Sequence, residues 1–161
     1  TYHDIGDHAE TLQIDYDPEQ LSYEDLLKVF WQSHRPIQPV WSRQYMSAVF
    51  YQKEDEKKIA ESMKSALERK HDIQFHTEIS ALDRFYLAED YHQKYRLSHV
   101  RELKSAMQEI YPKLQDYVDS TAVMRINGFL GHQGTKSQLS EIIGLLGLNE
   151  IEQSILRKMS R

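Results

Sequence analysis

Cysteine is absent from all 161 residues of the chain. Its absence excludes disulfides, thiolate zinc sites and a cysteine nucleophile within these residues. No apolar run approaches the ~20 residues that a helix needs to cross a bilayer. Thr1 is not followed by the basic region and apolar core of a secretory signal. The sequence therefore predicts a soluble, cytoplasmic protein with no membrane partner.

Basic residues are fewer than acidic residues in this chain. The chain has 20 Lys and Arg against 25 Asp and Glu, for a formal net charge of -5. Nucleic-acid affinity depends on clustered Lys and Arg, so nucleic acid is disfavoured as a partner. Glycines are few, and the three at 128, 131 and 134 lack the strand-to-helix context of a nucleotide fingerprint. We expect no cofactor.

The first half of the sequence alternates between strand and helix patterns. Leu12, Ile14 and Tyr16 alternate with polar residues, which is the period of a half-buried strand. Ser22 precedes an acidic first turn and an apolar helical face. The expected elements are a strand at about 9–17, a helix at 22–33, a loop to Tyr45, a strand at 46–51, a helix at 55–70 and a strand at 74–80.

The second half has mostly helical spacing. It predicts helices at 88–97, 98–110, 137–146 and 150–159, with a turn or two at 113–119, an ambiguous piece at 123–126 and a glycine-punctuated loop at 128–134. Strands followed by a run of helices indicate an α+β fold.

The opening residues carry the densest set of reactive side chains. His3, Asp4, Asp7, His8 and Glu10 offer five possible metal ligands, but their spacing matches no defined zinc pattern. A polar loop leading into a strand is the alternative. If the strand's apolar face begins at Leu12, Glu10 lies on that inward face. A carboxyl group there either finds hydrogen-bond partners or acts as a proton donor.

A second candidate cluster lies in the middle of the chain. Glu89 and His92 have the i, i+3 spacing of a helix, with Asp90 and His99 nearby. The same spacing is typical of a solvated helix surface whose side chains pair with each other. Surface pairing is the favoured interpretation.

Several ordered motifs together resemble the A-type peptide methionine-(S)-sulfoxide reductases. They are T-Y-H-D-I-G-D-H-A-E-T-L-Q-I-D-Y-D-P, L-S-Y-E-D-L-L-K-V-F-W-Q-S-H-R-P, R-Q-Y-M-S-A-V-F-Y, T-E-I and F-Y-L-A-E-D-Y-H-Q-K-Y. The match runs from Thr1 to about Leu97. The tail, with N-G-F-L-G-H-Q-G, looks like the C-terminal extension of an animal, insect-like branch.

The resemblance implies a reductase core at 1–97 and a helical C-terminal extension at 98–161. The implied fold is a two-layer, ferredoxin-like α/β sandwich. Its first strand, first helix and second strand would precede Thr1, together with the Gly-Cys-Phe-Trp segment that carries the nucleophile. We therefore expect this chain to be a fragment that is inactive by itself. The implied parent is a monomer that reduces peptidyl or free methionine-(S)-sulfoxide and is renewed by thioredoxin.

The resemblance also implies roles for three residues. Glu10 of H-A-E matches the family carboxylate that hydrogen-bonds or protonates the sulfoxide oxygen, and Tyr2 and Tyr45 match the two phenols that help to hold it. The chain departs from the family where Pro39-Val40-Trp41-Ser42 replaces the common Gly-Asn-Asp. It departs again where His34-Arg35-Pro36 replaces His-Asp-Pro.

Two other functions stay open. A cysteine-free relative could bind oxidised methionine in partner proteins without reducing it. A stress protein could bind metal through the His-rich opening.

Overall fold

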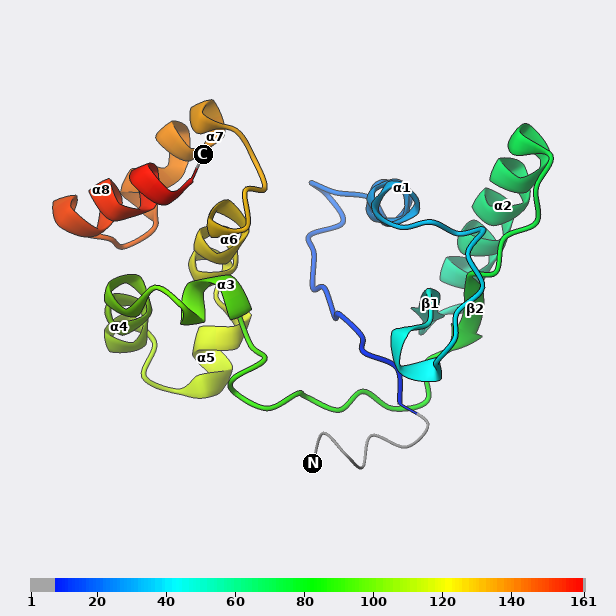
Figure 1. Cartoon of the computed structure of the whole chain (residues 1–161), viewed down its shortest axis with the longest axis horizontal. Coiled ribbons are helices and arrows are strands. Elements are labelled where there is room, and N and C mark those ends of the chain that lie inside the picture. Colours follow the sequence, from blue (N-terminus) through cyan, green and yellow to red (C-terminus); the bar gives the residue numbers. More distant parts are fainter. Residues whose placement is uncertain (1–7, 161) are drawn as a thin grey trace. The chain divides into compact units, whose positions relative to one another are not determined.

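The structure is a computed structural model, and it describes residues 8–160. The chain divides between Phe85 and Tyr86 into two compact units (Figure 1). The first contains helices and a short parallel sheet, and the second contains helices. The predicted α+β class is confirmed at this level.

The first unit is built on one pair of parallel strands. β1 (Ala48–Tyr51) pairs with β2 (Glu78–Ala81), in a register that runs from Ala48 opposite Glu78 to Tyr51 opposite Ala81. Helix α2 (Glu54–His71) connects the two strands and packs against both. The strands expected at 46–51 and 74–80 are confirmed in part, because each is shorter than its apolar pattern.

Two helices supply most of this unit's core. α1 (Tyr23–Ser33) begins where Ser22 Oγ accepts the Asp25 N–H at 3.1 Å. α2 begins where the Glu56 carboxylate accepts the N–H groups of Gln52 and Lys53. The buried residues are Leu27 and Trp31 from α1, Val49 from β1, Ala60 from α2, and Phe75. The helices expected at 22–33 and 55–70 are confirmed.

The strand expected at 9–17 is wrong. Residues 8–17 have no regular element and no place in the sheet. Leu12 is 81% exposed and Ile14 is 49% exposed, so neither contributes to a core. A strand needs a partner to satisfy its backbone groups. In the described part of the chain, this segment has only isolated backbone contacts, such as the bond from the Glu10 N–H to the Gln44 carbonyl.

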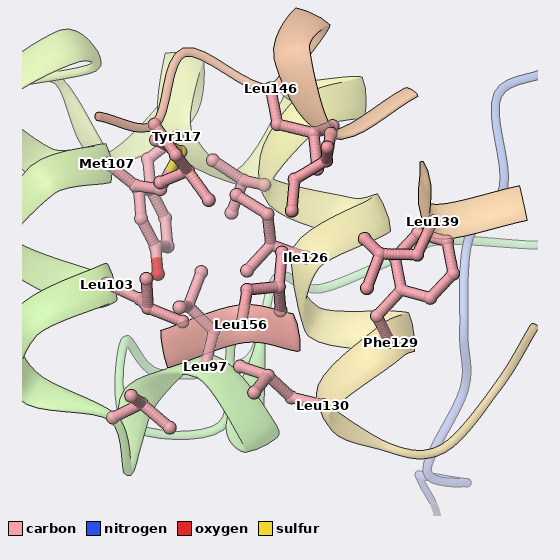
Figure 2. Close-up of a cluster of buried hydrophobic side chains, with 14 residues drawn as sticks. Leu97, Leu103, Met107, Tyr117, Ile126, Phe129, Leu130, Leu139, Leu146 and Leu156 are labelled. Carbon is pink, nitrogen blue, oxygen red and sulfur yellow. The ribbon is translucent and has the colours of Figure 1, made fainter. Parts of the chain in front are cut away.

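The second unit packs short helices around one apolar cluster. The elements are α3 (Tyr95–Ser98), α4 (Arg101–Ile110), α5 (Leu114–Asp119), α6 (Thr121–Leu130), α7 (Lys136–Ile142), η3 (Ile143–Leu145) and α8 (Glu150–Met159). Helix α6 contacts α3, α5 and α8. Figure 2 shows its Ile126 and Leu130 among buried side chains of the neighbouring helices.

Two expectations for this unit are wrong. Residues 90–94 form turns, and only residues 95–97 of the helix expected at 88–97 are helical, as part of α3. The glycine loop begins later than expected, because Gly128 lies inside α6 and Gly131 caps it. The apolar residues Val123, Ile126, Phe129 and Leu130 bury one face of a single helix, and this packing outweighs the low helix propensity of Gly128.

Candidate functional site

Glu10 is held by Gln44 through both backbone and side chain. The Glu10 N–H donates to the Gln44 carbonyl at 2.9 Å. The Gln44 Nε2 donates to Glu10 Oε1 at 2.9 Å. These two bonds join the H-A-E and R-Q-Y motifs, which lie far apart in the sequence. The Glu10 carboxyl group is therefore fixed beside the turn that carries Tyr45.

Tyr45 ends a short 3-10 turn, η2 (Arg43–Tyr45). Ser42 O accepts the Tyr45 N–H, and Arg43 O accepts the Met46 N–H, both at 3.2 Å. The Tyr45 side chain is 45% exposed, and its ring lies 5.4 Å from the Trp41 ring at 42°. The phenol is therefore anchored through its ring and can be reached from solvent.

The loop that carries Gln44 and Tyr45 is tied to the segment around β2 at both ends. At its start, Pro36 O accepts the His76 N–H at 2.7 Å. At its end, Ser47 O accepts the Glu78 N–H at 3.0 Å. Functional side chains hold their geometry when rigid elements support them. Here the support comes from the amino-terminal ends of two paired strands.

His34 reinforces the start of the same loop. Its Nδ1 lies 2.8 Å from Phe30 O, which can only accept, so Nδ1 carries a proton. Its Nε2 lies 2.9 Å from Oγ1 of the buried Thr77. Lys64 Nζ donates to Thr77 O at 2.8 Å. With both ring nitrogens hydrogen-bonded, His34 supports the start of this loop.

Glu10 does not face a core, because the strand expected to turn it inward does not form. Its side chain is exposed and accepts one hydrogen bond from Gln44. This corrects the expected inward position and leaves the carboxyl group open to a bound molecule. A carboxyl group in this position can hydrogen-bond a small polar oxygen and deliver a proton to it.

Tyr2 lies outside the described residues, as do His3, Asp4 and Asp7. The structure therefore does not place the second phenol or the histidine-rich metal candidate. Between residues 8 and 160, no group of three or more His, Asp or Glu side chains could hold a metal ion. In the same range, no helix has the length and apolar character to cross a membrane.

The second candidate cluster forms local contacts within its own segment. The His92 N–H donates to Glu89 O at 2.8 Å, in a turn. His99 Nδ1 lies 2.7 Å from Tyr95 O, and the two rings lie 4.4 Å apart. The helix expected to pair Glu89 with His92 does not form, and the bond from His92 to Glu89 is a backbone bond in a turn.

Sequence reasoning missed Gln44 and Trp41 as parts of the site. Gln44 carries no pattern of its own, and its only signal is its position next to Tyr45. Trp41 appeared only as a departure from a family motif. Its exposure of 84% could not be read from the sequence.

Comparisons with known proteins show which family the chain is similar to. The model of the family described as peptide methionine sulfoxide reductase matches residues 1–123. A peptide methionine sulfoxide reductase of Drosophila melanogaster is 36% identical over 159 residues, covering 95% of this chain and 62% of the fly protein. One from Salinispora arenicola is 40% identical over 97 residues, covering 55% of this chain and 44% of that protein.

A relative from Sulfolobus acidocaldarius is 41% identical over 98 residues, covering 57% of this chain and 55% of that protein. Of these three, the animal relative matches nearly the whole chain, and the other two match little more than half. The chain thus spans about half to three fifths of the length of these relatives. On the extent of the family match, the chain belongs to the peptide methionine sulfoxide reductase family.

Proposed function

We propose that these residues supply the oxygen-binding part of a reductase that converts peptidyl or free methionine-(S)-sulfoxide to methionine. The observation that carries the proposal is the double attachment of Glu10 to Gln44, beside Tyr45, in a chain of this family. Glu10 is the proton donor. Tyr45 and Tyr2 hold the oxygen as hydrogen-bond donors.

The chemistry explains why such donors are needed. The sulfoxide oxygen carries high negative charge, and it is a poor leaving group until it is protonated. Two thiols and the sulfoxide become a disulfide, methionine and water, so two electrons and two protons reach the substrate. The chain contains no cysteine, so the attacking thiolate comes from outside these 161 residues.

Several finer features belong to the same proposal. The whole protein is a cytoplasmic monomer, and thioredoxin reduces its disulfide. Its core, ending near residue 97, is a two-layer ferredoxin-like sandwich, and residues 98–161 form the helical extension. Helix α2, which packs against both β1 and β2, supports only the two-layer arrangement of helix on sheet. The Drosophila match over 95% of the chain supports an extension shared with an animal relative.

The test replaces Glu10 in the full-length reductase. Glu10→Gln keeps the shape and the contact with Gln44 but cannot donate a carboxyl proton. We expect the rate of methionine formation from methionine-(S)-sulfoxide with dithiothreitol to fall about 10²- to 10⁴-fold.

Two controls separate the possible failures. Glu19→Gln removes an exposed carboxyl group away from Gln44 and leaves the rate unchanged. The 161 residues alone show no turnover. An unchanged rate in Glu10→Gln removes Glu10 from the acid role, and an inactive full-length wild type rejects the reductase.

A further inference from the structure

We propose that Trp41 contacts the polypeptide around the oxidised methionine and so makes the site prefer peptidyl over free methionine sulfoxide. This inference rests on the proposed function and names its substrate class. It assigns a binding role to the residue at which the chain departs from the Gly-Asn-Asp common in the family.

Trp41 is the most exposed large apolar side chain in the described part of the chain, at 84%. Trp31, by contrast, is 8% exposed in the core of the same unit. An exposed tryptophan keeps a large apolar face in water, and such faces are typical of binding surfaces. A partner that contacts Trp41 would therefore remove a large apolar surface from water.

Trp41 is also held at the site. Its ring lies 5.4 Å from the Tyr45 ring, and Tyr45 follows Gln44, which binds Glu10. A molecule whose oxygen reaches Tyr45 thus places its neighbouring atoms near the Trp41 ring. Successive Cα atoms in a peptide are about 3.8 Å apart, so a flanking residue is within reach of that ring.

The segment before Trp41 suits an uncharged polypeptide. Residues 37–41 read I-Q-P-V-W and contain no charge, and Ile37 and Val40 are also exposed. The Gln38 N–H donates to Arg35 O at 3.1 Å, and Pro39 has a fixed φ. A segment restrained in this way loses less entropy when it binds.

Free methionine sulfoxide gains little from contact with the uncharged surface of residues 37–41. Beyond its side chain, it carries an ammonium and a carboxylate, which stay better solvated in water than against an uncharged aromatic and aliphatic face. A peptide replaces these charges with amides and adds flanking side chains. The Trp41 face therefore discriminates between the two substrates.

The experiment measures kcat/KM of the full-length reductase for a short uncharged peptide with a central methionine-(S)-sulfoxide and for the free amino acid. Dithiothreitol is the reductant. We expect Trp41→Ala to lower the ratio of the two values about tenfold, through KM for the peptide. Trp41→Phe retains most of the preference. Leu145→Ala, at a side chain 79% exposed in the second unit, leaves the ratio unchanged.

The outcomes separate this inference from the proposed function. An equal loss on both substrates means that Trp41 only supports Tyr45, and an unchanged ratio means that it contacts neither substrate; both overturn the inference. Wild-type enzyme without activity on either substrate rejects the proposed function itself. As a second measurement, the peptide should protect the Trp41 share of the emission, defined against Trp41→Phe, from acrylamide quenching. Full quenching at saturating peptide also overturns the inference.

Discussion

Among single residues, Gln44 makes the most direct contact with the candidate proton donor, because it forms two hydrogen bonds with Glu10. Substitution of Gln44 keeps the hydrogen bond from the Glu10 N–H to the carbonyl of residue 44. Removal of the Gln44 side chain eliminates the hydrogen bond from its Nε2 to Glu10 Oε1. We expect Gln44→Ala in the full-length reductase to leave Glu10 in place but free to rotate. A carboxyl group that rotates freely is held less often in the geometry for proton transfer, so kcat/KM should fall about tenfold or more.

The control for Gln44 is Gln52→Ala, which removes an exposed amide next to β1. The value of kcat/KM should fall in Gln44→Ala and not in Gln52→Ala, because only the first removes a contact with the Glu10 carboxyl group. Equal kinetics in the two variants would show that Gln44 does not position Glu10.

Asp25 gives a residue-scale prediction that does not depend on function. Hydrogen bonds from Lys28 Nζ at 2.7 Å and from Ser22 Oγ at 2.6 Å lower the pKa of Asp25 from 3.8 to about 2. Because the pKa is lower in the folded chain, this stabilisation is fully present above the ordinary carboxyl pKa. It is lost as pH falls toward the folded value.

Carboxyl NMR titration measures this directly. We expect Lys28→Met to move the pKa of Asp25 back toward its ordinary value, because Lys28 is the largest cause of the shift. Lys58→Met is the matched control, since Lys58 pairs with Asp55 on α2. A pKa for Asp25 that stays low in Lys28→Met would assign the shift to Ser22.

At the scale of elements, the turn between α6 and α7 depends on a glycine. Gly134 has φ of +93°, and a Cβ there would lie 2.8 Å from Phe129 Cε1. We expect Gly134→Ala to lower the free energy of unfolding by about 1–2 kcal/mol, from backbone strain and the displaced ring. Urea unfolding measures the change.

Gly128 provides the opposite case within α6. A Cβ at Gly128 meets nothing within 4 Å, so alanine there adds helix propensity without a clash. Gly128→Ala should raise the free energy of unfolding by up to about 1 kcal/mol. Equal effects of the two substitutions would contradict the strained turn.

The elements that could be predicted from the sequence are those that local chemistry determines. α1 and α8 have capping residues, Ser22 and Asn149, and apolar faces at helical spacing, and both were predicted closely. The segment 9–17 has an equally clear strand period but no partner in the sheet. An alternating apolar pattern does not by itself provide the neighbouring strand whose backbone groups a strand must pair with.

The site was predictable in its reactive groups but not in its supports. Glu10 and Tyr45 followed from family motifs, and the structure brings their segments together. Gln44 could not be singled out, because its role depends on a contact between residues that are distant in the sequence. The exposure of Glu10 was also missed, since it followed from a strand that does not form.

At the scale of the whole molecule, each of the two units has its own apolar core. Leu103 is completely buried in the second. We expect Leu103→Ala to cost that unit about 2–5 kcal/mol. Amide hydrogen exchange should then speed up in α4, α6 and α8 and stay unchanged in α1 and α2.

Leu145→Ala is the control for this prediction, because its side chain is 79% exposed and its loss should cost less than about 0.5 kcal/mol. If exchange in α2 accelerates as much as exchange in α6, the two cores unfold together. The prediction that the two cores unfold independently would then be wrong.

The segment between the two cores affects which insertions and deletions the chain can tolerate. Residues 82–89 form no helix or strand and are mostly exposed. Insertions in such a segment disturb little packing, and each doubling of a flexible loop costs only about 0.6 kcal/mol. A gene encoding this chain can therefore gain or lose codons here without unpacking either core.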